Sequence, residues 1–204
     1  MQEKKTSRSN QERTESTRMA LITAARQLFV ERGYAATSTP DIVSAAAVTR
    51  GALYHHFEDK AELFFAVSKQ MAQEVSAAID TSSAYAKSPM NALVEGSNAY
   101  FKAMAESGRA QLLLQEAPAV LNAQQLAQLS DMAGAYALEQ GLGALLRAEG
   151  SRASITSEEL HALTQLISAA FDRTAQALAQ QQDIYYHQTA LHKLLLGLCS
   201  AYAK

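Results

Sequence analysis

Apolar residues begin to recur at helical spacing only after the first 17 residues of the chain. Before that point Lys and Arg stand among Ser, Thr, Gln and Asn with almost nothing apolar, so residues 1–17 are predicted to be a disordered arm. From Arg18 onward the spacing becomes i, i+3, i+4, i+7 and i+8, which is typical of an amphipathic helix. We therefore predict a helix over Ala20–Phe29 that ends at Gly33. The positions that set this pattern are Leu21, Ala24, Ala25, Leu28 and Phe29.

The stretch from Ser38 to Phe57 reads as two short helices joined by a tight turn. Ser38 and Asp41 have the spacing of a capping box, and Pro40 fits a first helical turn because its missing N–H would be unpaired there. Thr49 is in position to cap the second helix. Residues 18–60 are thus predicted to form a three-helix head, whose core includes Ile42, Val48, Leu53 and Phe57.

Apolar periodicity continues through the rest of the chain, and residues 61–204 are predicted to form a larger helical body. Its first helix, from about Lys60 to Ile79, leaves the head and enters the body. It contains no glycine, so we expect a stiff mechanical link between the two parts. The fold class is all-α, with about nine helices in total. Further helices or short helical segments are predicted over residues 89–108, 109–116, 122–148, 156–182 and 184–202.

Composition agrees with an all-helical protein and limits where it is expected to work. The chain of 204 residues has no Trp, three Pro and nine Gly, a mixture that favours helices. One cysteine excludes an intramolecular disulfide and suits a reducing cytosol. The polar N-terminus has no secretory signal, and no stretch approaches the ~20 apolar residues of a membrane span. We therefore expect a cytoplasmic protein that does not enter a membrane.

The net charge of −2 argues against a general nucleic-acid binder, but the charge is unevenly distributed. Residues 1–60 hold nine Lys or Arg against seven Asp or Glu, whereas residues 61–204 hold nine against thirteen. This weak asymmetry fits a small DNA-reading head on an acidic body, and it also fits chance.

The second short helix has side chains that suit the major groove of DNA. Leu53 and Phe57 lie four apart and mark its buried face. Arg reads guanine edges, while hydroxyl groups and backbone N–H groups hold phosphates. The pattern therefore predicts a helix-turn-helix whose second helix enters the groove. The residues left to face outward are Thr49, Arg50, Ala52, Tyr54, His55 and His56.

The helix-turn-helix contains the string Thr49-x-Gly51-x-x-Tyr54-x-His56-Phe57, and Lys60 and Leu63-Phe64 follow it. This string resembles the DNA-binding domain of TetR-type transcriptional regulators, over about residues 15–75. The resemblance implies a repressor that binds double-stranded DNA at a palindromic operator as a homodimer, and that a small hydrophobic or aromatic ligand releases. It implies DNA contacts from Ser38, Thr39, Thr49, Arg50, Gly51, Tyr54, His55, His56 and Lys60.

Two positions depart from the pattern of that family, and a third is open to two interpretations. The turn often carries glycine where this chain has Ala47, and a left-handed conformation would cost an alanine on the order of 1 kcal/mol. A basic residue is common where this chain has Pro40, which moves base reading to the second helix. Lys60 lies at a helix N-terminus, where the dipole disfavours a cation. It either contacts a DNA phosphate or pairs in solvent with Glu58 or Asp59.

Several large flexible or aromatic side chains lie on different helices of the body. Each is a core residue by default, and the resemblance implies that some of them line a cavity for a small-molecule effector. Asp172 stands within an apolar helix. Facing inward it would need a partner, which a ligand could supply, and facing solvent it could pair with Arg173 or Gln176. The ligand-binding candidates are Tyr100, Phe101, Met104, Leu112, Leu113, Met132, Tyr136, Phe171 and Asp172.

The last two predicted helices, 156–182 and 184–202, carry many small residues, which let helices approach closely. This feature resembles the dimer surface of the TetR family, where two helices from each subunit form a four-helix bundle. Two-fold symmetry of that kind matches a palindromic operator.

No catalytic, metal-binding or phosphate-binding constellation stands out in the sequence, so we expect no enzyme, no metal and no cofactor. The alternative to a DNA-binding regulator is a helical ligand-binding or protein-interaction module that does not regulate transcription.

Overall fold

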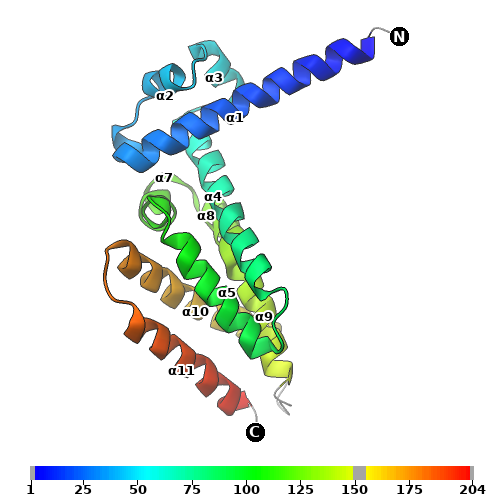
Figure 1. Cartoon of the computed structure of the whole chain (residues 1–204), viewed down its shortest axis with the longest axis vertical. Coiled ribbons are helices and arrows are strands. Elements are labelled where there is room, and N and C mark those ends of the chain that lie inside the picture. Colours follow the sequence, from blue (N-terminus) through cyan, green and yellow to red (C-terminus); the bar gives the residue numbers. More distant parts are fainter. Residues whose placement is uncertain (1–2, 149–154, 203–204) are drawn as a thin grey trace.

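The computed structural model describes residues 3–148 and 155–202, and every regular element within them is helical. The chain begins with a small head of three helices, α1 (Glu3–Ala36), α2 (Thr39–Ala45) and α3 (Arg50–His56). Figure 1 shows α2 and α3 packed on one side of α1, whose N-terminal part projects beyond the head. The prediction of an all-α protein is confirmed for the described residues.

The two short helices of the head begin and end where their sequence dictates. Ser38 and Asp41 form a reciprocal capping box at the start of α2, with Pro40 in the first turn. The Thr49 hydroxyl accepts a hydrogen bond from the N–H of Ala52 at the start of α3. Between them Ala47 has φ of 52°, the left-handed conformation in which an alanine is disfavoured. This turn fixes the angle between α2 and α3.

Large apolar side chains from all three helices and from the next one close the core of the head. Leu21 and Phe29 of α1, Ile42 of α2 and Leu53 of α3 are completely buried. The Phe29 ring meets the ring of Phe64, on α4, edge to face at 5.3 Å between centroids. The head therefore shares its core with the helix that leads into the body.

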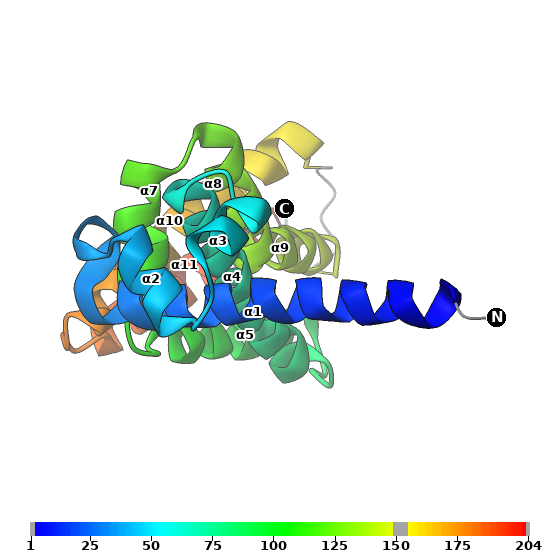
Figure 2. The same cartoon turned by 90° about the horizontal axis from the view of Figure 1, so that it is seen from above.

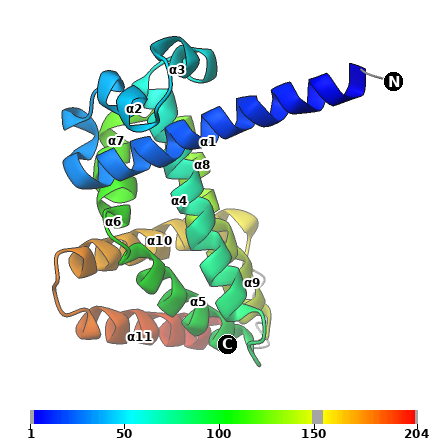
Figure 3. The ribbon, with the colours of Figure 1, turned by 45° about the horizontal axis from the view of Figure 1, so that its top comes forward.

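The long helix α4 (Lys60–Ser83) runs from the head into the body. Figure 3 shows α4 beside α5 and α9, with α10 crossing behind and α11 at the end away from the head. The later elements are α5 (Pro89–Met104), α6 (Arg109–Gln111), the π-helix η1 (Leu112–Glu116), α7 (Ala117–Val120), α8 (Ala123–Ser130), the π-helix η2 (Asp131–Ala135), α9 (Tyr136–Ala148), α10 (Ser157–Ala179) and α11 (Tyr185–Tyr202).

The predicted disordered arm is wrong where the structure describes it. Residues 3–17 continue α1 back to Glu3, and residues 1–2 lie outside the described part. Thr14 and Thr17 each donate a hydrogen bond to the carbonyl four residues earlier, as helical residues do. Viewed from above in Figure 2, this polar part of α1 projects past the body without covering it. A polar helix needs no apolar partner, which is why apolar periodicity did not reveal it.

The single helix predicted over residues 122–148 is also corrected. It is interrupted at Gly134, which has φ of 126° inside η2. A Cβ at this position would lie 2.7 Å from Cδ1 of Ile79 on α4, so only glycine allows the close approach. Pro118 lies in the first turn of α7. The two π-helical segments, η1 and η2, both adjoin the interior of the body.

Candidate DNA-binding head and ligand cavity

The outer surface of the helix-turn-helix presents the residues that the sequence singled out for DNA. We call this surface the DNA face. Thr49, Arg50, Gly51, Tyr54 and His55 are exposed on or just before α3. At the start of α2, exposed Ser38 and half-buried Thr39 adjoin them, and His56 is half-buried at the end of α3.

Three of these side chains interact across the two helices. A hydrogen bond between the Thr39 and Tyr54 side chains, followed by the influence of Arg50, lowers the pKa of the Tyr54 phenol. The Arg50 guanidinium lies over the Tyr54 ring, 5.5 Å from its centroid. Stacking of this kind keeps the planar donor of Arg50 extended along an exposed surface. The arrangement can present a guanidinium to a base edge, with hydroxyl groups beside it for phosphate.

At the other end of α3 the DNA face borders α1. Partial burial, and then the nearby His55 and Arg18, lower the pKa of the His56 imidazole. The Arg18 guanidinium lies over the Phe57 ring at 5.5 Å. Arg18 was not among the residues predicted to contact DNA. Its one signal in the sequence was its place at the start of the amphipathic pattern. That place did not show that Arg18 lies beside the helix-turn-helix in space.

The Lys60 ammonium turns towards the end of α1, so its predicted pairing with Glu58 or Asp59 is wrong, while its contact with a DNA phosphate stays a prediction. The ammonium donates hydrogen bonds to the carbonyl oxygens of Tyr34 and Thr37, each at 2.8 Å, and lies 4.0 Å from the centroid of the Tyr34 ring. These carbonyls follow the left-handed Gly33 at the end of α1. A cation is favourable at a helix C-terminus, so Lys60 fastens α4 to the end of α1.

A cavity of about 450 Å³ lies inside the body, bounded by α4, α5 and the elements from η1 to α10. Its walls are mostly apolar, and the irregular segments η1 and η2 both contribute to them. Five predicted ligand-binding residues line it, namely Tyr100, Met104, Leu113, Phe171 and Asp172. The other lining residues are Ile79, Ser83, Ala92, Leu93, Gly96, Ser97, Leu114, Pro118, Leu126, Leu129, Ser130, Ala133, Gly134, Ala135, Ala137, Leu138, Gly141, Ser168 and Gln176.

Four residues predicted to line the cavity do not. Phe101 and Leu112 are buried in the core on other sides of their helices. Met132 packs against the core outside the lining. Tyr136 is 67% exposed, because the break at Gly134 changes the direction of the chain just before α9 begins. Periodicity identified these side chains as large and apolar but could not give their rotation about the helix axis.

Several lining residues escaped the sequence analysis. Small residues such as Gly96 and Gly141 let the helices of the wall pack closely, since a Cβ on Gly141 would lie 2.7 Å from Cδ2 of Leu93. Glycines within apolar helices were the available signal. Glycine weakens a helix, so its presence there indicates that close packing needs the space.

The acidic residue of the cavity faces inward. The phenol of Tyr100, itself buried, donates a hydrogen bond of 2.6 Å to Oδ1 of Asp172. Burial raises the pKa of the Asp172 carboxyl, and the hydrogen bond from Tyr100 opposes that effect. Burial, and then the Asp172 charge, also raises the pKa of Tyr100. Asp172 therefore pairs with Tyr100 across the cavity wall, and not with Arg173 or Gln176 as an exposed residue would.

Contacts between head and body lie on the other side of the cavity wall. The N–H of Tyr34, just after the end of the regular part of α1, donates to Oε2 of Glu116 in η1 at 2.6 Å. The same π-helix supplies Leu113 and Leu114 to the cavity. One short irregular segment thus touches both the cavity and the head.

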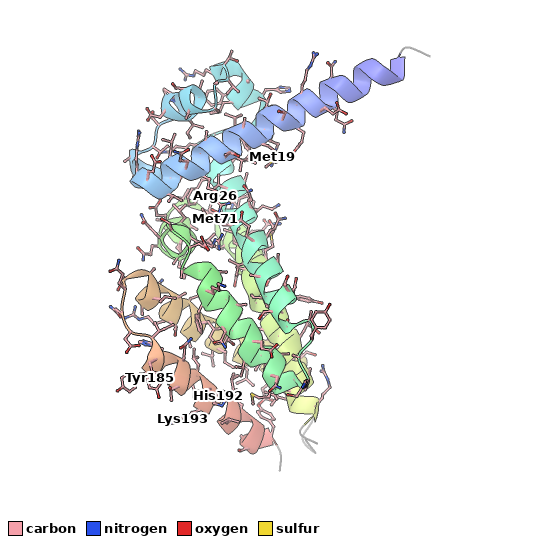
Figure 4. All side chains as sticks on the ribbon, viewed as in Figure 1. Met19, Arg26, Met71, Tyr185, His192 and Lys193 are labelled. Carbon is pink, nitrogen blue, oxygen red and sulfur yellow. The ribbon has the colours of Figure 1, made fainter. Side chains whose placement is uncertain are left out.

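A charged cluster joins the same parts of the protein. Glu74 on α4 forms ion pairs with Arg26 of α1 and with Arg109 of α6. Arg109 is buried and also donates to the carbonyl of Ala103 at 2.5 Å. Figure 4 shows Arg26 beside Met71, where α1 crosses α4. Arg26, through its hydrogen bond and charge, and Arg109 lower the pKa of Glu74 below its usual value. Partial desolvation opposes this effect.

Within residues 3–148 and 155–202, no three His, Cys, Asp or Glu side chains come together as metal ligands would. Of the helices in the same part of the chain, none combines the length and apolar character needed to cross a membrane.

Comparisons with known proteins agree with both halves of this architecture. A family model described as bacterial regulatory proteins, tetR family, matches residues 21–67. A second, described as tetracyclin repressor-like, C-terminal domain, matches residues 90–199, which is more than half of the chain.

Individual relatives match the head in sequence and the whole chain in fold. The transposon Tn10 TetC protein of Escherichia coli is 46% identical over 71 residues, which span 35% of this chain and only 36% of TetC. A tetR-family regulator from Pectobacterium atrosepticum superposes with a TM-score of 0.68 at 27% identity, over 94% of this chain and 96% of that one. RolR bound to resorcinol has the same fold, with a TM-score of 0.67 at 18% identity over 92% of this chain and 89% of RolR.

The first family model covers the helix-turn-helix and the start of α4, and the second covers most of the residues that line the cavity. The chain belongs to the tetR family of bacterial regulatory proteins, which are DNA-binding transcriptional regulators.

Proposed function

We propose that this protein is a ligand-responsive transcriptional repressor, which binds a palindromic operator as a homodimer and releases it when a small molecule enters the body. The observation that carries the proposal is the presence, in one chain, of an exposed DNA face and a largely apolar 450 Å³ cavity. The match of the body to a tetracyclin repressor-like domain supports repression. The solved structure of RolR with resorcinol is an example of this fold holding a small aromatic ligand.

The DNA face supplies base reading and backbone contacts in this proposal. Arg50 reads base edges from the first turn of α3, which is where a recognition helix usually contacts them. Thr49, Tyr54 and the α2 hydroxyl groups hold phosphates, as do His55 and His56. Lys60 acts less directly in this proposal, because its ammonium donates two of its three hydrogens to Tyr34 and Thr37. Its contribution to DNA binding is to hold the head together.

Dimerisation through α10 and α11 supplies the second head. Leu166 and Leu194 are 70% and 58% exposed, and together with Leu163, Ala170 and Leu198 they border an apolar groove between the two helices. Gly197 lies in the same groove, where an added Cβ would meet nothing within 4 Å. An open apolar face of this kind suits the close approach of a second copy.

Ligand and DNA are coupled in this proposal because the cavity wall also holds the head. A ligand that displaces Leu113 or Leu114 moves η1, and Glu116 of η1 holds the N–H of Tyr34. Two recognition helices in one dimer must lie about 34 Å apart to enter successive grooves. The helix α4 is long, because each of its residues adds about 1.5 Å. A small tilt at its body end therefore produces a larger movement of the head. Ligand and DNA then weaken each other equally.

The test begins with selection of DNA sequences by the purified protein and measurement of its affinity for the selected and for random DNA. We expect Arg50→Ala to lose on the order of 1–3 kcal/mol on selected DNA and to relax the preference at one or two positions per half-site. Arg173→Ala removes the same charge from an exposed site on α10 and should bind like the parent protein. Failure to select any sequence would favour the alternative, a ligand-binding or protein-interaction module that does not regulate transcription.

A further inference from the structure

We propose that the cavity selects hydrophobic ligands that carry a protonated amine, and that Asp172 is the residue that selects them. This proposal rests on the proposed function, because it names the chemical class of ligand for the same cavity. The observation behind it is that the lining of the cavity contains one carboxylate and no cationic side chain, and that three of its five hydroxyl groups already donate within the protein.

Three of the five hydroxyl groups that line the cavity donate within the protein, whereas Ser130 and Ser168 form no such hydrogen bond among the described residues. Tyr100 donates to Asp172, while Ser83 and Ser97 donate to the carbonyls of Ile79 and Leu93 at 2.9 and 2.5 Å. One N–H of Gln176 is directed at the carbonyl of Leu114 at 3.4 Å. A hydroxyl has only one hydrogen to give, so these groups offer lone pairs to a ligand more readily than hydrogens. The cavity therefore suits a ligand that donates hydrogen bonds.

Asp172 decides between a neutral donor and a charged one. Its Oδ1 accepts the Tyr100 hydrogen bond, which leaves Oδ2 as the strongest acceptor on the wall. A half-buried carboxylate in an apolar wall is costly unless a positive charge or several donors compensate it. A ligand ammonium would supply both the charge and the hydrogen bond, whereas an alcohol would supply only the hydrogen bond. A ligand carboxylate would face a like charge and few free donors.

The rest of the cavity favours a hydrophobic and aromatic body for such a ligand. The Tyr100 and Phe171 rings stack at 6.0 Å between centroids on the side of the cavity that holds Asp172. Aliphatic side chains from α4, α5 and α9 face them, Ile79, Leu93 and Leu138 among them. A cavity of about 450 Å³ lies within the range that holds small organic molecules.

The experiment uses compounds that share one hydrophobic body and differ in the head group: 4-phenylbutylamine, 4-phenylbutan-1-ol and 4-phenylbutyrate, with the matching naphthyl series. Binding to the full-length protein is measured by calorimetry without DNA. We expect the amines to bind at least about tenfold more tightly than the carboxylates, the effect of one charge-assisted hydrogen bond. In Asp172→Asn the amines should weaken by about tenfold, while the alcohols change by less than about threefold.

Two further variants make the result specific to this carboxylate. Asp80→Asn removes the same charge from an exposed position on α4 outside the lining, and it should keep the preference for amines. Tyr100→Phe removes the hydrogen bond to Asp172 but keeps the carboxylate, so it should also keep that preference. Thermal melts of each variant establish that it is folded.

Carboxylates that bind as well as the amines, amines that do not bind, or an Asp172→Asn protein that still prefers amines would overturn the proposal. Because binding is measured without DNA, this failure is separate from failure of the proposed function. A protein that selects an operator but does not prefer amines remains a repressor with another ligand class. A protein that prefers amines but selects no DNA has the cavity proposed here without the regulatory role.

Discussion

At the scale of single residues, Gly51 on the DNA face is not required by the packing of the free protein. It lies in the first turn of α3, and the nearest atom to an added Cβ would be Oγ1 of Thr49 at 3.9 Å. Glycine weakens a helix relative to alanine, so its presence here has a cost to stability. Close approach of α3 to DNA gives a reason for it, because a Cβ would stand between the backbone and the groove.

We therefore expect Gly51→Ala to stabilise the free protein by about 0.5 kcal/mol and to weaken its binding to selected DNA. Chemical denaturation measures the first effect, and titration of labelled operator measures the second. An alanine that improves both stability and DNA affinity would show that α3 does not approach DNA through this residue.

Asp172 is a second residue whose presence costs stability. Burial raises the pKa of its carboxyl above the unfolded value of about 3.9, so the folded protein holds the proton more tightly than the unfolded chain. The stabilisation from that proton is complete below the unfolded pKa and is lost as pH rises through the folded pKa. Tyr100 is the other titratable residue of the lining, and its pKa is raised beyond the range of the experiment.

We expect Asp172→Asn to melt at a higher temperature than the parent protein at pH 7, with the difference shrinking as pH falls towards 4. Thermal melts over this pH range measure the difference. Asp80→Asn, an exposed acid on α4, serves as the control and should show little change at any pH. A parent protein that is the more stable of the two at pH 7 would mean that Tyr100 compensates the buried charge fully.

Local sequence predicted residues whose partners are close in the chain and missed those whose partners are distant. The capping box of Ser38 and Asp41 and the cap at Thr49 involve neighbours three residues away, and both are present in the structure. Lys60 binds carbonyls 26 and 23 residues earlier, which no local pattern shows. The direction of Asp172 was left open for the same reason, because its partner Tyr100 lies 72 residues earlier.

At the scale of elements, the irregular segment from α6 to α7 is the part of the body that touches both cavity and head. Gly108, with φ of 72°, brings its start within contact of Val30 on α1, where an added Cβ would lie 2.8 Å from Cγ2 of that valine. Further along the segment, the Glu116 carboxylate accepts a hydrogen bond from the N–H of Tyr34. A wide π-turn packs less regularly than an α-helix and is common at functional sites. This segment is therefore suited to change shape when the cavity is filled.

We expect Glu116→Ala to reduce the coupling between ligand and operator by on the order of 1 kcal/mol, about fivefold, while ligand affinity stays nearly unchanged. The coupling is the ratio of operator affinities measured with and without a saturating ligand of the cavity. Glu95→Ala, at an exposed position on α5, is the matched control. If Glu116→Ala lowers ligand affinity and leaves the coupling intact, the segment belongs to the binding site and does not transmit the signal.

Helix positions followed from periodicity, but helix interruptions did not. The sequence predicted one helix where α8, η2 and α9 stand, because apolar spacing passes through Gly134 without a change. That glycine is required by the close approach of Ile79, a residue of another helix. The opposite error occurred in α1, where residues 3–17 were predicted to be disordered but are helical without an apolar face. Local sequence patterns predict the class of fold, whereas the shape of the cavity depends on contacts between helices.

At the scale of the whole molecule, the head and the apolar groove lie at opposite ends. Figure 1 shows α2 and α3 at one end and α11 at the other, with α4 running between. A dimer formed through α10 and α11 would leave both DNA faces uncovered. The distance between the two heads would then depend on the path through each body, and the cavity lies on that path.

Leu194 is 58% exposed and borders the groove between α10 and α11, so its substitution should not disturb the core of one subunit. In a dimer that buries the groove, Leu194→Asp places an unpaired charge in an apolar interface at a cost of several kcal/mol. We expect this variant to be monomeric at micromolar concentration in sedimentation, to keep the helical circular dichroism of the parent, and to lose operator binding. Leu196→Asp makes the same change at a residue of α11 that is 45% exposed and outside the groove, and it should remain dimeric. If Leu194→Asp stays dimeric while Leu196→Asp dissociates, the second subunit packs on another face of α11, and the spacing of the two heads must be derived from that face instead.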